Sequence, residues 1–190
     1  MINLNEIKVG GDTSKVFNDG NAGEVTVQMG VARKKPEDGE RFPDWNFIAK
    51  DSQERTLREG FYYLDPAGYK SEEKYNNHLI FEGRRLKHIL NALYGDDLEF
   101  PPFSSPKEML DWCMNTIAKK NGTTVRIGVT YGTVKRPSNY LQLKSTFPFI
   151  VNGDDKEIKF SNIDLMERPA PSTPSGPDPS DKDVKLPWEE

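Results

Sequence analysis

The sequence has few of the residues that form disulfides, metal centres and histidine-based active sites. Among its 190 residues there is one cysteine, Cys113, and there are two histidines, His78 and His88. A single cysteine cannot form an intrachain disulfide, so nothing in the cysteine usage argues for secretion. A structural Cys/His zinc site needs about four such ligands, which this chain cannot supply. We therefore expect no metal and no cofactor.

Long apolar runs are also absent. No run approaches the roughly 18 residues that a membrane span needs. The N-terminal residues have neither the basic start nor the apolar stretch of a signal peptide. Charged residues make up 29% of the chain and the mean hydropathy is −0.74. We expect a cytoplasmic protein with no membrane partner.

Acidic residues are missing from one long stretch. Between Trp112 and Gly153 there is no Asp or Glu, while the same 42 residues carry six Lys or Arg, a local charge of +6. The last 26 residues carry six acids and three bases, a net −3, which leaves −1 for residues 1–164 out of the total of −4. This segregation predicts a near-neutral body with a basic surface, followed by an acidic tail.

Hydrophobic periodicity predicts strands in the first half of the chain. In 25–31 apolar residues alternate with small or polar ones, as in a half-buried strand. Aromatic and β-branched residues favour further strands over Trp45–Lys50 and 61–64. A turn-rich loop at 36–43 separates the first two of these segments.

Two helices are predicted next. The first covers 84–94. Gly83 costs about 1 kcal/mol in a helix interior, so residues 77–82 could form a strand instead of extending this helix. The second begins at a capping box and ends at a turn. Its signals are Ser105 as the N-cap, Pro106 at the first helical position, Glu108 three residues after the cap, and Asn121-Gly122 at the end.

The second half of the chain returns to strands. Period-two alternation covers 124–134 and, after a turn at 136–139, also 140–146. Pro148 predicts a bulge or an edge. Asn152-Gly153 is typical of a hairpin turn, which a short strand at 157–162 would follow.

This order of elements favours a mainly β fold with one or two helices. Three strands, a helical segment and two or three further strands match a five-stranded OB-like barrel, whose helix lies between strands three and four; other small α+β folds share such an order. We expect an OB-like nucleic-acid-binding domain over 1–164. Residues 165–190 are Pro-rich and have too little apolar area to offset their ordering entropy, so we expect a disordered tail there.

The last long hairpin holds the main candidate binding residues. Opposite the apolar face of 124–134 lies Arg126, and the outward face of 140–146 carries Tyr140 and Lys144. Cations beside a protruding ring suit a single-stranded nucleic acid, because Lys and Arg neutralise phosphates while the ring stacks on a base. The residues that we expect to continue this track are Lys135 and Arg136 in the connecting loop, Arg33, Lys34 and Lys35 after the first strand, and Trp45 and Tyr62 beyond them. Taken singly, each is equally well explained as sheet cover or as a solubilising charge.

A resemblance supports this interpretation. Basic and aromatic strands at 124–144, followed by a Pro/Gly/Ser linker and an acidic tip at 168–190, resemble the single-stranded-DNA-binding proteins of bacteria and their phages. The resemblance implies an OB fold that holds DNA during replication or recombination, and a tail that recruits replication or recombination proteins, in the host cytoplasm if a phage encodes the chain. The tail residues implied in recruitment are Asp181, Asp183, Leu186 and Trp188. Separately, INLNEIKVGG and FEGRRLKHILNALYG are similar to a family of small phage early-region proteins of uncharacterised role.

Two other classes of function compete with strand binding. An enzyme is disfavoured, because the carboxylate pairs are adjacent in sequence, no phosphate-binding glycine loop is present, and His88 is expected on an exposed basic helix face. The alternative is a phage structural or adaptor protein that uses the same surfaces to bind proteins. Stacking and phosphate contacts serve RNA as well as DNA, and the oligomeric state is left open.

Overall fold

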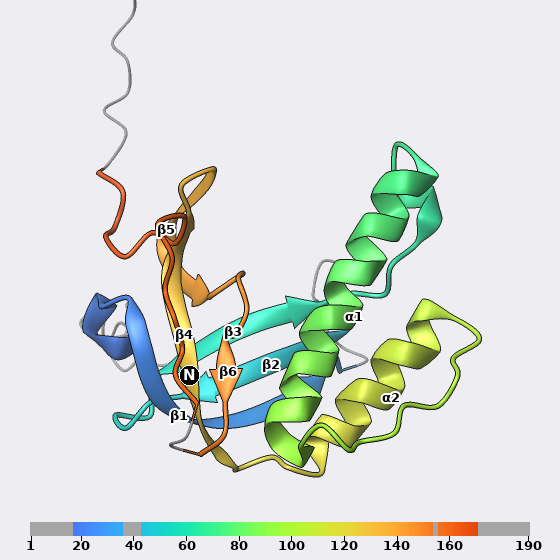
Figure 1. Cartoon of the computed structure of the whole chain (residues 1–190), viewed down its shortest axis with the longest axis horizontal. Helices are drawn as coiled ribbons and strands as arrows, with labels where there is room; N and C mark the ends of the chain where they lie inside the picture. The colour runs from blue at the N-terminus through green and yellow to red at the C-terminus, as the bar shows by residue number, and fades with distance from the viewer. Residues whose placement is uncertain (1–16, 36–42, 154–155, 171–190) are drawn as a thin grey trace, which may run out of the picture.

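A computed structural model describes residues 17–35, 43–153 and 156–170 of the chain (Figure 1). Within these ranges the protein is mainly β, with two helices between the third and fourth described strands. The helices are α1 (Glu72–Tyr94) and α2 (Pro106–Ala118), and short 3₁₀ turns cover Phe17–Gly20 and Pro66–Gly68. The strands are β1 (Gly23–Arg33), β2 (Trp45–Lys50), β3 (Thr56–Phe61), β4 (Thr124–Thr133), β5 (Arg136–Leu143) and β6 (Ile150–Val151).

The strands form one curled antiparallel sheet. Its order is β3-β2-β1-β4-β5, and β6 pairs with β4. The curl makes a half-barrel and brings β3 and β5, the two ends of this order, into contact. Helices α1 and α2 pack together on one side of the sheet, and the β4–β5 hairpin rises away from them (Figure 1).

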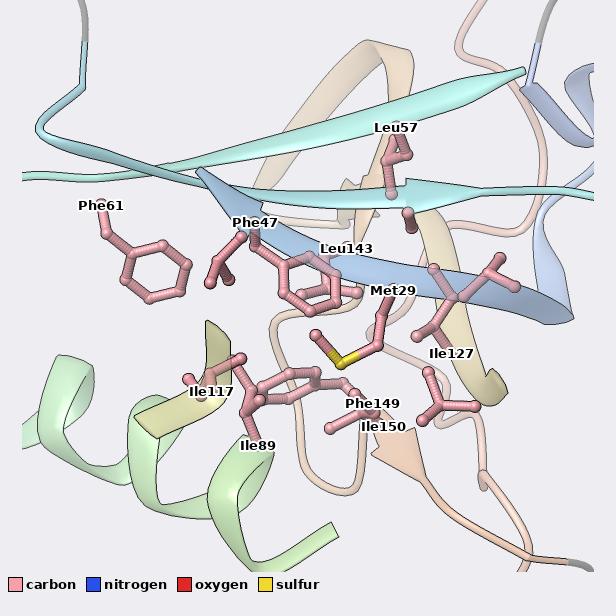
Figure 2. Packing of buried hydrophobic residues seen from close by; sticks show 14 of the residues in the cluster. Met29, Phe47, Leu57, Phe61, Ile89, Ile117, Ile127, Leu143, Phe149 and Ile150 are labelled. Atoms are coloured by element: carbon pink, nitrogen blue, oxygen red, sulfur yellow. The ribbon is translucent and has the colours of Figure 1, made fainter. Parts of the chain in front are cut away.

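A hydrophobic core lies between the inner face of the sheet and the two helices. The predicted alternation of 25–31 is confirmed, because its apolar residues are all buried while the residues between them are not. Met29 and Phe47 from the sheet face Ile89 of α1, with Ile117 close by (Figure 2). Each fully buried side chain of this size contributes roughly 1.5–3 kcal/mol. The core therefore decides which face of β1–β3 remains outside.

Helix α1 is longer than the sequence patterns predict. It begins at Glu72 and runs without a break through Gly83, so the strand considered for 77–82 is wrong. Ser71 Oγ caps the helix by accepting from the Lys74 amide, and acidic residues in the first turn favour the positive end of the helix dipole. At Gly83 the helix passes α2, where an added Cβ would lie 3.9 Å from Met109 Sδ. A good cap and this packing outweigh the propensity of one glycine.

Helix α2 begins as predicted. Ser105 Oγ accepts from the Glu108 amide at 3.2 Å, which confirms the N-cap, and Pro106 is the first helical residue. The Glu108 carboxylate departs from the usual capping box, because it accepts from the amide and hydroxyl of Ser104. This contact lowers the pKa of Glu108.

Two predicted strand boundaries are wrong. The third strand is 56–61 rather than 61–64, because pairing with β2 runs from Lys50↔Thr56 to Trp45↔Phe61. The fifth strand begins at Arg136, where a turn was predicted, so that only residues 134–135 connect it to β4. Gly132 explains this tight hairpin: its φ is +85°, and a Cβ there would lie 2.3 Å from the Arg136 carbonyl oxygen.

The segment after β6 does not form the strand predicted over 157–162. It crosses the outer side of β4, where Ile158 is buried, and then hydrogen-bonds to the end of that strand. The Tyr131 amide donates to Leu165 O at 2.8 Å, and the Leu165 amide donates to Gly132 O at 3.1 Å. The chain therefore remains attached to the sheet at Leu165, the first residue assigned to the tail from sequence. Most of that predicted tail, 171–190, lies outside the described residues.

Among the residues that the structure does describe, neither helix is long and apolar enough to cross a membrane.

Candidate nucleic-acid interface

The tip of the β4–β5 hairpin exposes three of the predicted site residues. The Tyr140 side chain is directed outward, as expected, and the residue is 78% exposed. Lys135 and Arg136 are exposed too, and neither side chain has a hydrogen bond or ion pair within the described ranges. Tyr140 borders a hollow of about 460 Å³ that it shares with residues 168–170. The start of the predicted tail thus lies beside this ring.

Lys144 does not lie on the outward face where the sequence pattern placed it. It is only 1% exposed, and its Nζ donates to Thr146 O at 2.9 Å and to Pro148 O at 3.4 Å. Nζ also lies 3.9 Å from Asp164 Oδ2, whose carboxylate is fully buried. Burial lowers the pKa of Lys144, an effect that Asp164 opposes. The outward-facing phosphate contact predicted for Lys144 is wrong, because β5 ends at Leu143 and the chain then turns inward.

Arg126 is held by the protein itself. Its Nη1 donates to Glu24 Oε1 at 2.6 Å, and its Nη2 donates to the carbonyl oxygens of Gly153, at 2.9 Å, and Lys156. The expectation that this face of β4 is open is wrong, because the 156–165 segment covers it. A Cβ on Gly128, for example, would lie 2.9 Å from Ile158 Cγ2.

Trp45 lies inside the molecule. It is 4% exposed, and its indole Nε1–H donates to Asp111 Oδ1 of α2 at 2.8 Å. The same oxygen accepts from Tyr63 Oη, also at 2.8 Å. The prediction of an exposed Trp45 ring is wrong, since this network ties the start of β2 to α2.

Arg33 is exposed but partnered. Its Nη2 donates to Tyr63 Oη at 3.2 Å and lies 3.8 Å from Asp111 Oδ2, and its guanidinium lies 5.6 Å from the centre of the Trp45 ring. Lys34 and Lys35 follow the end of β1; Lys34 is partly exposed and Lys35 is exposed. The Lys34 backbone is fixed by its amide, which donates to Asp44 O at 2.9 Å.

Tyr62 directly follows β3, and its side chain stays on the surface. It is 53% exposed, and its ring leans back over Gly60. A Cβ on Gly60 would lie 2.8 Å from Pro43 Cβ and 3.3 Å from Tyr62 Cε2. Gly60 therefore allows Pro43 and Tyr62 to close over the end of β3.

The strand pairings reveal a surface that the sequence patterns missed. The residues of β1, β2 and β3 that point away from the core form three cross-strand rows. We call this surface, together with Tyr62, the β3 face. Its rows are Gln28/Lys50/Thr56, Gly30/Ile48/Arg58 and Ala32/Asn46/Gly60.

The charge of the β3 face is entirely positive. Its rows hold two cations and no carboxylate. Lys50 Nζ pairs with Glu54 Oε2 at 2.9 Å in the turn after β2, but the Arg58 guanidinium has no hydrogen bond or ion pair with any described residue. Gly30, Ala32 and Gly60 add no large side chain to the rows, although Asn121 lies beside Gly30, and Pro43 and Tyr62 lie over Gly60. The signal that could have found Arg58 was the alternation of 57–61 with buried Leu57 and Phe61.

Arg136 lies at the edge of the sheet next to β3. A cavity of about 230 Å³ at the seam between β3 and β5 is lined by Glu59, Arg85, Arg136 and Gln142, among others. Arg85 Nη2 pairs with Glu59 at 3.0 Å inside it. Neighbouring residues of a strand point to opposite faces, so Glu59 faces the helices while Arg58 faces outward. The seam therefore places Arg136 at the free edge of β3, beside the β3 face but not on it.

His88 is not the surface residue that the sequence suggested. It is half buried against Phe147 and Phe149, and its Nε2 accepts from the Phe149 amide at 3.3 Å. Burial lowers the pKa of His88, and the nearby Lys156 and Lys144 act in the same direction. The ring is thus a neutral acceptor that holds the segment before β6.

Comparison of the chain with family models, with curated proteins and with solved structures finds no match in any of the three. The four predicted tail residues, Asp181, Asp183, Leu186 and Trp188, lie outside the described part of the chain. The functional conclusion accordingly depends on the geometry of the folded body.

Proposed function

We propose that this protein binds single-stranded nucleic acid on the β3 face, with Lys34, Lys135 and Arg136 extending the track. The observation that carries the proposal is a sheet face whose three rows hold no carboxylate, with an Arg58 that has no partner among residues 17–35, 43–153 and 156–170, and a protruding Tyr62. Phosphates would lie against Arg58 and the flanking cations, and Tyr62 would stack on a base. Neither contact reads sequence, so binding is largely sequence-independent.

The topology supports an OB-like identity for the body. Three features favour this proposal, because they are expected of a partly open five-stranded OB barrel: the order β3-β2-β1-β4-β5, the contact between β3 and β5, and the helices between β3 and β4. OB domains bind oligonucleotides on strands two and three, between the loops that join strands one and two and strands four and five. Lys34 and Lys135 occupy those two loops here, and the β3 face lies on those two strands.

The ligand that we propose first is single-stranded DNA in replication or recombination. RNA is the second, because it offers the same stacking and phosphate contacts. The tail is proposed to recruit replication or recombination proteins in the cytoplasm through Leu186 and Trp188. Its starting point beside Tyr140 would place a recruited protein next to the bound strand. We propose that Tyr140 stacks on a second base at the edge of the interface.

The test is a titration of a single-stranded oligonucleotide over a salt series with matched variants. Arg58→Ala should weaken binding and reduce the slope of log affinity against log salt by about 0.7, the value for one lost contact to a single strand. Arg84→Ala removes an equal charge from the exposed side of α1 and should change neither. An unchanged salt slope for Arg58→Ala would remove that residue from the interface.

The aromatic contacts are tested in the same assay. Tyr62→Ala should weaken binding by roughly 1–3 kcal/mol, as expected for one lost stacking contact, and Tyr140→Ala serves as the comparison at the hairpin. If Tyr140→Ala weakened binding and Tyr62→Ala did not, the interface would lie on the hairpin and not on the β3 face. Absence of saturable binding to either DNA or RNA would instead favour the structural or adaptor protein.

A further inference from the structure

An aromatic pocket opens at the end of the β3 face. Its volume is about 360 Å³, and its lining is contributed by the end of β3, the turn that follows and the first turns of α1. This size lies within the range of small-ligand sites. The residues that matter here are Tyr62, Leu64, Asp65, Tyr69, His78 and Glu82. Tyr62 belongs both to this pocket and to the β3 face, so the two surfaces are continuous.

The pocket walls are preformed. Tyr69 packs edge-on against Tyr75, with ring centres 5.4 Å apart, and its Oη lies 2.5 Å from His78 Nδ1. His78 Nε2 in turn lies 3.5 Å from Glu82 Oε1, and Arg85 holds the same carboxylate from behind at 3.2 Å. These contacts keep the Tyr69 ring in place, so a flat ligand can stack without ordering it first.

The polar groups of the pocket differ in sign from those of the β3 face. Here the charged groups are the carboxylates of Asp65 and Glu82. Asp65 Oδ1 accepts from the Ala67 amide at 2.9 Å, while its Oδ2 has no partner among the described residues. A phosphate would be repelled by both carboxylates and held by Arg58 outside. What can enter is the uncharged part of a nucleotide, and a carboxylate accepts hydrogen bonds from an exocyclic amino group of a base.

We infer that this pocket receives one unstacked base of the bound strand and prefers bases that carry an amino group, cytosine being the smallest. The inference rests on the proposed strand binding and adds a modest base preference to it. Cytosine presents its N4 amino donors at the position where thymine presents the O4 acceptor. The base would stack on Tyr69 and donate to Asp65 Oδ2, whereas thymine would direct an acceptor at a carboxylate.

The experiment compares oligo-dC with oligo-dT of equal length, at pH 8 and fixed salt. One additional net hydrogen bond predicts roughly threefold to tenfold tighter binding of oligo-dC. Asp65→Asn, which retains a capping oxygen for the turn, should abolish this preference while oligo-dT binds at least as tightly as before. Tyr69→Phe should retain the preference, and Tyr69→Ala should lose it. Tyr75→Ala is the matched control, since Tyr75 touches Tyr69 but does not line the pocket.

The outcomes separate the two proposals. Equal affinity of the unchanged protein for both oligonucleotides, or a preference that survives both Asp65→Asn and Tyr69→Ala, would overturn the base pocket and leave strand binding intact. Failure of both oligonucleotides to bind would overturn the proposed function itself. Because Asp65→Asn and Tyr69→Phe are nearly isosteric changes at the surface, a folding defect in Tyr69→Ala would still leave the inference testable.

Discussion

A substitution of Lys144 tests whether this cation stabilises the fold or binds a ligand. We consider Lys144→Met, which keeps the aliphatic stem but removes the ammonium. The change leaves the carbonyl oxygens of Thr146 and Pro148 without this donor, and leaves the buried Asp164 carboxylate without the cation 3.9 Å away. Removing one partner of a buried pair costs about 3–5 kcal/mol.

The expected loss lies at the lower end of that range. Asp164 keeps three donors, the Thr146 hydroxyl and the amide and hydroxyl of Ser161, so its charge remains partly compensated. We expect the free energy of unfolding to fall by about 3 kcal/mol. For a protein of this size that corresponds to a decrease in melting temperature of roughly 6–12 °C.

Urea unfolding followed by tryptophan fluorescence measures this loss. Lys159→Met, an exposed lysine on the covering segment, is the control and should leave stability unchanged within about 0.5 kcal/mol. The double variant Lys144→Met/Asp164→Asn removes the unpaired charge and should recover part of the loss. If Lys144→Met left stability intact but weakened strand binding, our assignment of this residue to the fold would be wrong.

Three further results are expected. Gly128→Ala should destabilise the protein by roughly 1–3 kcal/mol, measured by urea unfolding, because its Cβ would lie 2.9 Å from Ile158 Cγ2 and 3.1 Å from Lys144 Cδ; an unchanged midpoint would mean that the covering segment yields. Since burial lowers the pKa of His88, the unfolded chain binds more protons below the ordinary value of 6.5, so the free energy of unfolding should fall as the pH drops below that value; His88→Gln should flatten this dependence, and an equally steep profile would contradict it. Deleting 171–190 removes five acids and two bases, so affinity for single-stranded DNA should rise modestly at low salt and hardly at high salt; weaker binding after deletion would show that the tail contacts the strand.

Local patterns in the sequence determined much of the framework. The alternation in 25–31 and 124–134 placed β1 and β4, because a strand with one buried face must repeat every two residues. The second strand was placed at its observed bounds, Trp45–Lys50. The capping signals at Ser105 and Pro106 placed the start of α2, since the orphan amides of a first turn need an acceptor nearby in the chain. Each of these signals acts over a few residues and does not depend on the rest of the fold.

Only the tertiary structure decided which residues are open to a ligand. Alternation shows that a strand has two faces, but not whether a distant segment covers the second one. Here 156–165 crosses the outer side of β4, and so Arg126 and Lys144, which alternation placed outside, serve the fold. Arg58 was not recognised for the converse reason. The spacing of Leu57 and Phe61 was a local signal for its strand, whose bounds are set by pairing with β2. Its exposure, however, depends on no later segment crossing β3 within the described residues, and long-range packing determines that.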